Sequence, residues 1–319
     1  MSFSKKVLVL GAGGFIGSHL VKRLKKNNCY VKAVDLKYPE FSNSLADEFI
    51  FGDLKEKYIC DDAFNEKFDE VYQLAADMGG AGYIFTGDND ANIMTNSIMI
   101  NLNVLERHDK YNKIFYSSSA CVYSKHNQID SKNPKCNEDS AYPADPDSNY
   151  GWEKLFSERL YLAYNKNHKV NVKIARFHNI YGPEGNWNNG KEKSISALCR
   201  KIALADTEIE IWGDGNQTRS FLYIEDCIDA VLKFMDVDFI GPVNIGSEEM
   251  ISINDLANII LEISGKKLDF KYNLNAPIGV KGRNSDNRLF LEKVGFNINS
   301  NLRNGIENTY NWILKQIKI

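Results

Sequence analysis

The chain has 319 residues, of which 43% are hydrophobic and 25% are charged, so it can bury a full core in one large domain or two closely packed ones. Its formal net charge of −3 gives no reason to expect a nucleic-acid partner or an anionic membrane surface. We find neither a signal peptide nor an uncharged apolar run of the roughly 18 residues that a membrane span requires, so we expect a cytoplasmic protein. The six scattered cysteines form no C-x-x-C pair and are expected to be reduced thiols without a metal.

A glycine-rich turn, GAGGFIG, occupies residues 11–17 between a strand-like apolar run and a helical pattern. Glycines suit a tight turn where a pyrophosphate approaches bare N–H groups at a helix N-terminus. A second strand ends at Asp35, whose carboxylate could accept both ribose hydroxyls of NAD and would repel the 2′-phosphate of NADP. Taken separately, the turn and a helix-capping Asp35 would be ordinary features. The predicted cofactor contacts here are Gly11, Gly14, Phe15, Ile16, Gly17 and Asp35.

Two further strand ends continue this pattern. Asp53 and Leu54 follow a strand at residues 49–51, where they could meet the adenine, and another strand ends in Leu74, Ala75 and Ala76. Small residues there would let NAD lie against the backbone. Strands alternating with helices predict an α/β fold with a Rossmann-like doubly wound parallel sheet, which binds ligands at the carboxyl ends of its strands.

A glycine-rich loop at residues 77–82 and a helix at residues 92–106 come next. The loop would serve either as a surface turn or, through Gly79, as a close approach to a ligand. We expect the helix to pack against the sheet or against a second subunit.

The next strand, at residues 113–116, delivers Ser119 and Cys121 to the same edge of the sheet. Tyr150 and Lys154 follow, four residues apart and therefore on one face of a helix. A free phenol titrates at about 10, so we expect the Lys154 ammonium and the positive nicotinamide ring to favour its phenolate. Tyr150 would then take a proton from a substrate alcohol as hydride passes to NAD, while Ser119 holds the oxygen. Tyr150 and Lys154 are also predicted to contact NAD.

The second half of the chain carries the expected substrate domain. We predict an NAD-binding domain over residues 1–175, to which segments around 213–246 return, and a smaller α/β domain over residues 176–319. Arg219 and Arg283 have the guanidinium fork that suits a diphosphate, although surface salt bridges would be the ordinary interpretation.

GAGGFIG, the Ser-Ser-Ser strand end and YGWEK together resemble the extended short-chain dehydrogenase/reductase family, the NAD-dependent epimerases and dehydratases. AADMGGAGYIF, SSSACVY, RFHNIYGP, WGDGNQTRSF and GRNSDN are similar to its GDP-mannose 3,5-epimerase branch, over almost the whole chain. The resemblance implies an NAD-dependent isomerase, a homodimer and a GDP-sugar substrate. The sugar would be oxidised at C4, inverted at C3 and C5, and reduced again, giving GDP-L-galactose from GDP-mannose with GDP-L-gulose as a by-product.

The resemblance also assigns Cys121 and Lys193 as the acid and base of inversion, with Lys191 in place of the family's arginine. We expect burial to lower the pKa of Lys193 from the ordinary value of about 10.4. Without the resemblance, the thiol would be interpreted as a buried structural residue and the lysine as a solvated one. Ala120 and Cys121 replace the Asp-Glu pair of the dehydratases, so dehydration lacks its acid. The implied substrate contacts are Gly79, Ser119, Ala120, Cys121, Asn179, Glu192, Lys193, Ser194, Lys201, Gln217, Thr218, Arg219 and Arg283.

Two other functions remain open on the sequence. A C4 oxidoreductase or 4-epimerase acting on a related GDP-hexose or GDP-heptose needs only Ser119, Tyr150 and Lys154. A non-catalytic NAD-sensing protein would leave these three residues without a task.

Overall fold

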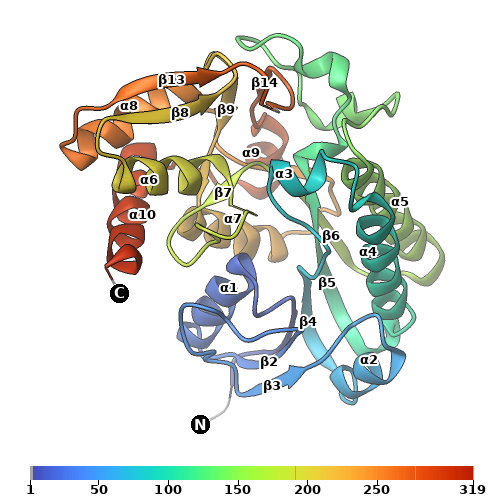
Figure 1. Ribbon diagram of the computed structural model, residues 1–319. Coiled ribbons are helices and arrows are strands. Elements are labelled where there is room, and N and C mark those ends of the chain that lie inside the picture. The colour runs from blue at the N-terminus through green and yellow to red at the C-terminus, as the bar shows by residue number, and fades with distance from the viewer. Residues whose placement is uncertain (1–2, 191, 277, 319) are drawn as a thin grey trace.

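A seven-stranded parallel sheet forms the centre of the computed structural model, which describes residues 3–190, 192–276 and 278–318 (Figure 1). The strand order is β11-β6-β5-β4-β1-β2-β3. The strands are β1 (Lys6–Leu10), β2 (Tyr30–Asp35), β3 (Glu48–Phe51), β4 (Phe68–Gln73), β5 (Tyr111–Ser119), β6 (Val172–Phe177) and β11 (Val243–Ile245). The predicted doubly wound sheet is confirmed. The chain order reverses between β1 and β4, and a crevice opens at such a point beyond the carboxyl ends of the strands.

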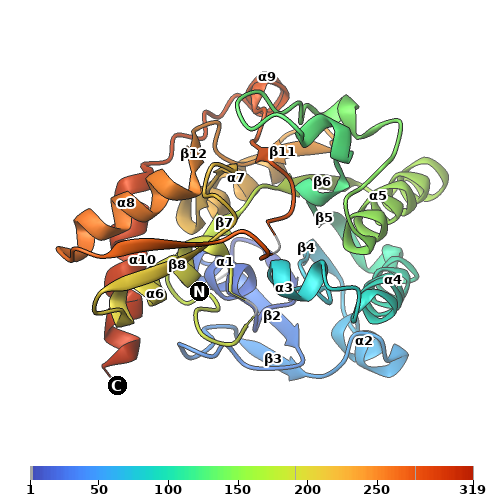
Figure 2. The same cartoon turned by 45° about the horizontal axis from the view of Figure 1, so that its top comes forward.

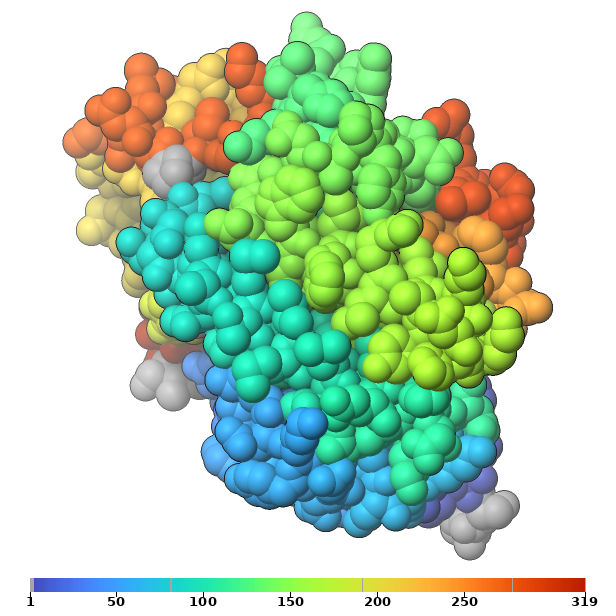
Figure 3. Space-filling view, turned by 90° about the vertical axis from the view of Figure 1, so that its right-hand side faces the viewer, coloured from blue at the N-terminus to red at the C-terminus, as the bar shows by residue number. Residues whose placement is uncertain are grey.

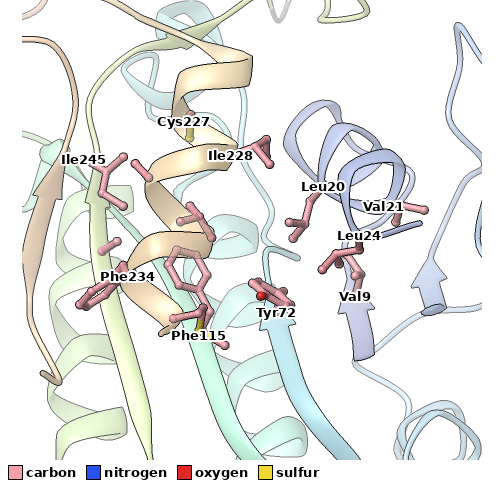
Figure 4. Close-up of a cluster of buried hydrophobic side chains, with 14 of the residues drawn as sticks. Val9, Leu20, Val21, Leu24, Tyr72, Phe115, Cys227, Ile228, Phe234 and Ile245 are labelled. Atoms are coloured by element: carbon pink, nitrogen blue, oxygen red, sulfur yellow. The ribbon is translucent and has the colours of Figure 1, made fainter. Parts of the chain in front are cut away.

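Helices cover both faces of the sheet because its strands are apolar on both sides. Val7 and Val9 belong to one buried cluster, whereas Leu8 and Leu10 belong to the other. Figure 4 shows the first cluster, with Leu20 and Ile228 packed between two helices and the sheet. The helices of this face are α1 (Phe15–Lys26), α7 (Ile224–Met235) and α9 (Arg288–Val294); those of the other are α2 (Lys57–Ala63), α4 (Asp90–Leu105) and α5 (Asn149–His168).

The later part of the chain builds a second layer beside the sheet (Figure 2). Its helices are α6 (Ser194–Leu204), α8 (Ile253–Ser264) and α10 (Leu302–Ile317). Its small sheets pair β8 (Glu208–Trp212) with β13 (Asp269–Asn273), β9 (Thr218–Ser220) with β12 (Met250–Ser252) and β14 (Gly282–Arg283), and β7 (Ile180–Tyr181) with β10 (Leu222–Tyr223). Residue 243 nevertheless lies in the central sheet, opposite Ala175 of β6. The division into domains at residue 175 stays a prediction.

Short helical segments fill several connections. They are α3 (Ala81–Ile84), η1 (His108–Lys110), η2 (Ala120–Val122), η3 (Lys125–Gln128) and η4 (Glu138–Ala141). Of these, η1 lies before the amino end of β5, and the other four follow the carboxyl ends of β4 and β5. The glycine-rich loop expected at residues 77–82 thus runs into a helical turn. Within the described ranges, no helix has the length and apolar character needed to cross a membrane.

Candidate active site

Two cavities adjoin at the carboxyl edge of the central sheet. Their volumes are about 570 Å³ and about 500 Å³. Ile16, Leu74, Ser117 and Lys193 line both of them, so the two spaces form one cleft. A dinucleotide and a second ligand could therefore meet at this shared wall.

The first cavity contains the predicted cofactor residues apart from Tyr150 and Lys154. It is lined by Gly11, Gly14, Phe15, Ile16, Gly17, Asp35, Asp53, Leu54, Leu74, Ala75 and Ala76. Gly14 caps α1 without a side-chain hydrogen bond, which leaves backbone N–H groups at the helix N-terminus for an anion. The turn requires glycine, because a Cβ at Gly13 would lie 1.9 Å from the Lys37 carbonyl oxygen.

Asp35 lies at the end of β2, beside this glycine turn. Its carboxylate accepts hydrogen bonds from the backbone N–H groups of Gly13 at 2.8 Å and Lys37 at 3.2 Å. Burial raises the pKa of Asp35, while these two N–H groups act in the opposite direction. The bare helix N-terminus, the glycine turn and a carboxylate at the end of β2 together fit NAD.

The proposed oxidation residues meet at the wall of the second cavity. Ser119 ends β5, and its Oγ accepts a hydrogen bond of 3.2 Å from the backbone N–H of Cys121. Ser148 caps α5 by accepting from the Gly151 N–H, which fixes the start of the helix that carries Tyr150 and Lys154. Only glycine fits at position 151, because a Cβ there would lie 2.1 Å from the Cys121 carbonyl oxygen. This close approach brings the tyrosine helix against the thiol segment.

Burial dominates the electrostatics of Tyr150. Burial raises the pKa of Tyr150, Cys121 and Glu153 raise it further, and only the Ser119 hydroxyl lowers it. Lys154 donates its ammonium hydrogen bond to the Ser117 carbonyl at 3.0 Å, and its Nζ lies 5.7 Å from the centroid of the Tyr150 ring. Burial also lowers the pKa of Lys154. Lys154 is not among the groups that shift the pKa of Tyr150 here, and the combined effect predicted for Lys154 and the nicotinamide ring stays a prediction.

The second cavity gathers the predicted substrate residues with one exception. Its lining includes Gly79, Ser119, Ala120, Cys121, Asn179, Glu192, Lys193, Ser194, Lys201, Gln217, Arg219 and Arg283, together with Tyr150 and Lys154. Thr218 is not part of this lining, and its hydroxyl donates to the Ser131 carbonyl oxygen. Lys191 lies outside the described ranges, so its place in the position of the family's arginine stays a prediction.

Lys193 and Cys121 approach the cleft from different layers. Lys193 precedes α6, and burial lowers its pKa as predicted, while the sulfur atoms of Cys121 and Cys227 act in the opposite direction. Cys121 lies in η2 and lines the second cavity. A thiol and an ammonium thus come within electrostatic range beside the oxidation residues.

The two arginines line the cavity but make their hydrogen bonds within the protein. Arg219 donates to backbone carbonyls that include those of Ile278 at 3.0 Å and Val280 at 2.7 Å. Burial, followed by the charge of Arg283, lowers the pKa of Arg219 to about 10. Arg283 donates to Asp147 at 2.6 Å and to the Cys121 sulfur at 3.3 Å. Both arginines nevertheless line the second cavity, and their contact with a diphosphate stays a prediction of the sequence.

The family model for the NAD dependent epimerase/dehydratase family matches residues 7–246. The chain belongs to this family. It is 44% identical over 317 residues to GDP-mannose 3,5-epimerase from Arabidopsis thaliana, an alignment that covers 98% of this chain and 83% of the relative. The resemblance drawn from the motifs and the expected NAD dependence are confirmed.

Solved structures of other epimerases have the same fold as this family member. UDP-glucose 4-epimerase from Thermotoga maritima superposes with a TM-score of 0.84 at 23% identity and covers 98% of this chain and 99% of that one. UDP-glucuronic acid 4-epimerase from Bacillus cereus, solved with UDP-glucuronic acid and NAD, gives a TM-score of 0.79 at 29% identity with the same coverage. The α/β class and the nucleotide-binding sheet are therefore those of the family.

One residue in the wall of this epimerase's first cavity was not singled out from the sequence. Glu184 follows β7 with a φ of 64°, a left-handed conformation that is uncommon for a residue with a side chain. Its carboxylate accepts from Lys22 Nζ at 2.5 and 2.7 Å and from Ser42 Oγ at 2.9 Å. Glu184 thereby joins α1 to the loop that contains Phe41. Glu184 and Phe41 both line the cavity. No local signal predicts this bridge, because Ser42 and Glu184 are 142 residues apart.

Asp147 and Gln128 are two further residues that the sequence analysis missed. Asp147 Oδ2 and Gln128 Oε1 both accept from the Arg283 guanidinium. Asp147 lies three residues before Tyr150, where an acidic residue is ordinarily interpreted as part of a helix start. Among the described residues, no group of three or more His, Cys, Asp or Glu side chains could hold a metal ion.

Proposed function

We propose that this epimerase acts on a GDP-sugar and converts GDP-mannose to GDP-L-galactose, with GDP-L-gulose formed when only C5 inverts. The observation that carries the proposal is the presence of Cys121 and Lys193 in one cleft with Ser119, Tyr150 and Lys154. A 4-epimerase needs only the last three. The 44% identity to an enzyme named GDP-mannose 3,5-epimerase supports the choice of sugar and base.

The first step is oxidation of the sugar at C4. Bound NAD would accept hydride from C4 and later return it to the same carbon. Tyr150 takes the proton of the C4 hydroxyl, while the Ser119 hydroxyl holds the oxygen in place. Burial raises the pKa of Tyr150, so the proton transfer at this residue needs positive charge near the phenol, and the nicotinamide ring of bound NAD would supply such a charge.

The second step is inversion at the carbons that flank the ketone. The C4 carbonyl acidifies the C3–H and C5–H bonds, and Cys121 as thiolate removes one of these protons. Lys193 delivers a proton from its ammonium to the opposite face of the same carbon. Before the second carbon inverts, the Cys121 thiol gives a proton to solvent and the Lys193 amine takes one from it. Burial lowers the pKa of Lys193, which makes this ammonium a stronger acid than a solvated lysine. Hydride then returns to C4, and Tyr150 gives its proton back to the oxygen.

Deuterium exchange tests the proposal directly. The protein is incubated with GDP-mannose in heavy water, and nuclear magnetic resonance follows deuterium at C3 and C5. We expect exchange in the wild type, and its loss in Cys121→Ala and Lys193→Ala while C4 hydride transfer continues. Cys136→Ala is the matched control, because this buried thiol lines neither cavity.

Two outcomes would contradict the assignment. Exchange that persists in both variants would remove Cys121 and Lys193 from the mechanism. Inversion at C4 without any deuterium would instead establish a 4-epimerase, which is the activity named for the Bacillus cereus relative. A panel of other GDP-hexoses and GDP-heptoses in the same assay decides which sugar is preferred.

We also propose that the protein is a homodimer, built on α4 and α5. These helices adjoin on one face of the molecule (Figure 3). They expose Met99, Leu102, Trp152 and Phe156, large apolar side chains that a second copy would cover. Light scattering measures the expected doubled mass. A cytoplasmic location stays a prediction of the sequence.

A further inference from the structure

The guanidinium of Arg283 connects three segments that the chain brings together from far apart. Its Nη1 donates to the Cys121 sulfur at 3.3 Å, and its Nη2 donates to Asp147 Oδ2 at 2.6 Å. Its Nε donates to Gln128 Oε1. The three guanidinium nitrogens thus donate hydrogen bonds to residues of η2, of the loop before α5 and of η3. A planar guanidinium held on several sides keeps one orientation.

The ion pair between Arg283 and Asp147 is buried. Only 8% of the Arg283 side chain and 4% of the Asp147 side chain are exposed. A buried pair is weak evidence for stability, because desolvation offsets much of its attraction. The pair is therefore better explained by what its geometry positions, and the nearest reactive group is the thiol of Cys121.

A donor fixed against this thiol has a chemical consequence. The thiolate is the nucleophilic and basic form of cysteine, and adjacent cations stabilise it. Arg283 carries a permanent positive charge and directs one N–H at the sulfur. Without an anchor, a flexible arginine side chain lining a cavity of about 500 Å³ could turn to other acceptors.

Asp147 provides that anchor. Its other oxygen, Oδ1, accepts from Ser148 Oγ at 3.2 Å, and Ser148 caps the helix that carries Tyr150. Asp147 therefore ties the arginine, and through it the thiol, to the start of the tyrosine helix.

We propose that Asp147 is a positioning residue for the proton transfers at C3 and C5, because it holds Arg283 in the orientation that donates to Cys121. The inference rests on the proposed function in assigning Cys121 as the base. It also gives Arg283 a role beside the thiol, apart from the diphosphate contact expected from the sequence. The hydrogen bonds of Asp147 go to Arg283 and Ser148 and not to Ser119, Tyr150 or Lys154, so we expect its effect to fall mainly on inversion.

Alkylation of Cys121 tests the contact without any substrate. Iodoacetamide is small enough to enter the cavity, and peptide mass spectrometry follows carbamidomethylation at this one cysteine. We expect alkylation about tenfold slower in Asp147→Ala than in the wild type, because one hydrogen bond to a charged group is lost. Asp147→Asn keeps an oxygen that accepts from Arg283 and should restore most of the rate.

Two further variants separate positioning from a loss of structure. Asp286→Ala is the matched control, since it removes another Asp–Arg pair, with Arg288, outside both cavities, and should alkylate at the wild-type rate. Arg283→Lys covers the case in which Asp147→Ala does not fold. An ammonium cannot reproduce the fork, so we expect the same slow alkylation. Circular dichroism checks that each variant is folded.

A second experiment, with GDP-mannose present, compares deuterium exchange and C4 hydride transfer in the same variant. In Asp147→Ala we expect deuterium exchange at C3 and C5 to fall about tenfold, while C4 hydride transfer stays close to the wild-type rate. Wild-type alkylation in folded Asp147→Ala, or in folded Arg283→Lys, would overturn the positioning role. Absence of exchange in the wild type would overturn the proposed epimerisation instead, and the alkylation result would still decide whether Asp147 positions Arg283 against the thiol.

Discussion

Replacement of Glu184 by glutamine should weaken the hold of this epimerase on NAD. The Glu184 carboxylate lines the first cavity and joins Lys22 of α1 to Ser42 at its edge. Burial raises the pKa of Glu184, but the hydrogen bonds from Lys22 and Ser42 outweigh burial and leave it below its ordinary value. The bridge is therefore ionised at neutral pH and is lost only as the pH falls below 4.5, the ordinary value.

The size of the effect follows from the exposure of the pair. The side chains of Lys22 and Glu184 are 30% and 22% exposed, so the bridge is neither fully solvated nor fully buried. A partly buried charge-assisted bond of this kind is worth about 1–2 kcal/mol. If the bridge must open before NAD leaves, Glu184→Gln should raise the NAD dissociation constant about five- to thirtyfold.

Retention and release of NAD measure this prediction without turnover. Chromatography of the purified protein gives the NAD content after gel filtration, and calorimetry gives the dissociation constant of the stripped protein. Asp229→Asn is the control, because it removes another ion pair of α1, that with Arg23, outside the NAD cavity. Equal retention in Glu184→Gln and the wild type would refute the argument that this bridge restrains the cofactor.

Two other predictions concern the glycine turn and a buried histidine. Gly13→Ala should abolish the NAD binding measured by calorimetry, because the new Cβ would clash with the Lys37 carbonyl oxygen and the backbone cannot yield. Gly82→Ala is the control and should be tolerated, since the nearest atom to its Cβ would be 4.0 Å away. Unaltered NAD affinity in Gly13→Ala would contradict the tight-turn argument. Burial lowers the pKa of His178 from 6.5 to about 3. Between pH 6.5 and pH 5 the unfolded chain therefore binds a proton at this residue that the native protein does not bind. The free energy of unfolding should consequently fall by about 2 kcal/mol over this pH range. Urea titrations of His178→Gln should lack this part of the slope; an unchanged slope would assign it to other groups.

The sequence alone was sufficient where function depends on short spacings. The glycine turn, the strand before it and Asp35 define the NAD cradle, because the geometry of one strand, one turn and one helix fixes their relative positions. Tyr150 and Lys154 share a helical face for the same reason. Cys121 could be placed beside Ser119 because only one residue separates them.

The tertiary structure decided the contacts of long side chains and the effects of burial. Arg283 reaches Asp147 across 136 residues of sequence, so its partner depends on how two loops meet and not on any local pattern. The pKa of Tyr150 likewise follows from the desolvation that the surrounding layers impose, which no short spacing in the sequence reveals. The sequence thus singled out the groups to which we assign the chemistry of this epimerase. Packing between distant segments determined which of these groups contact one another, because such contacts depend on the whole fold.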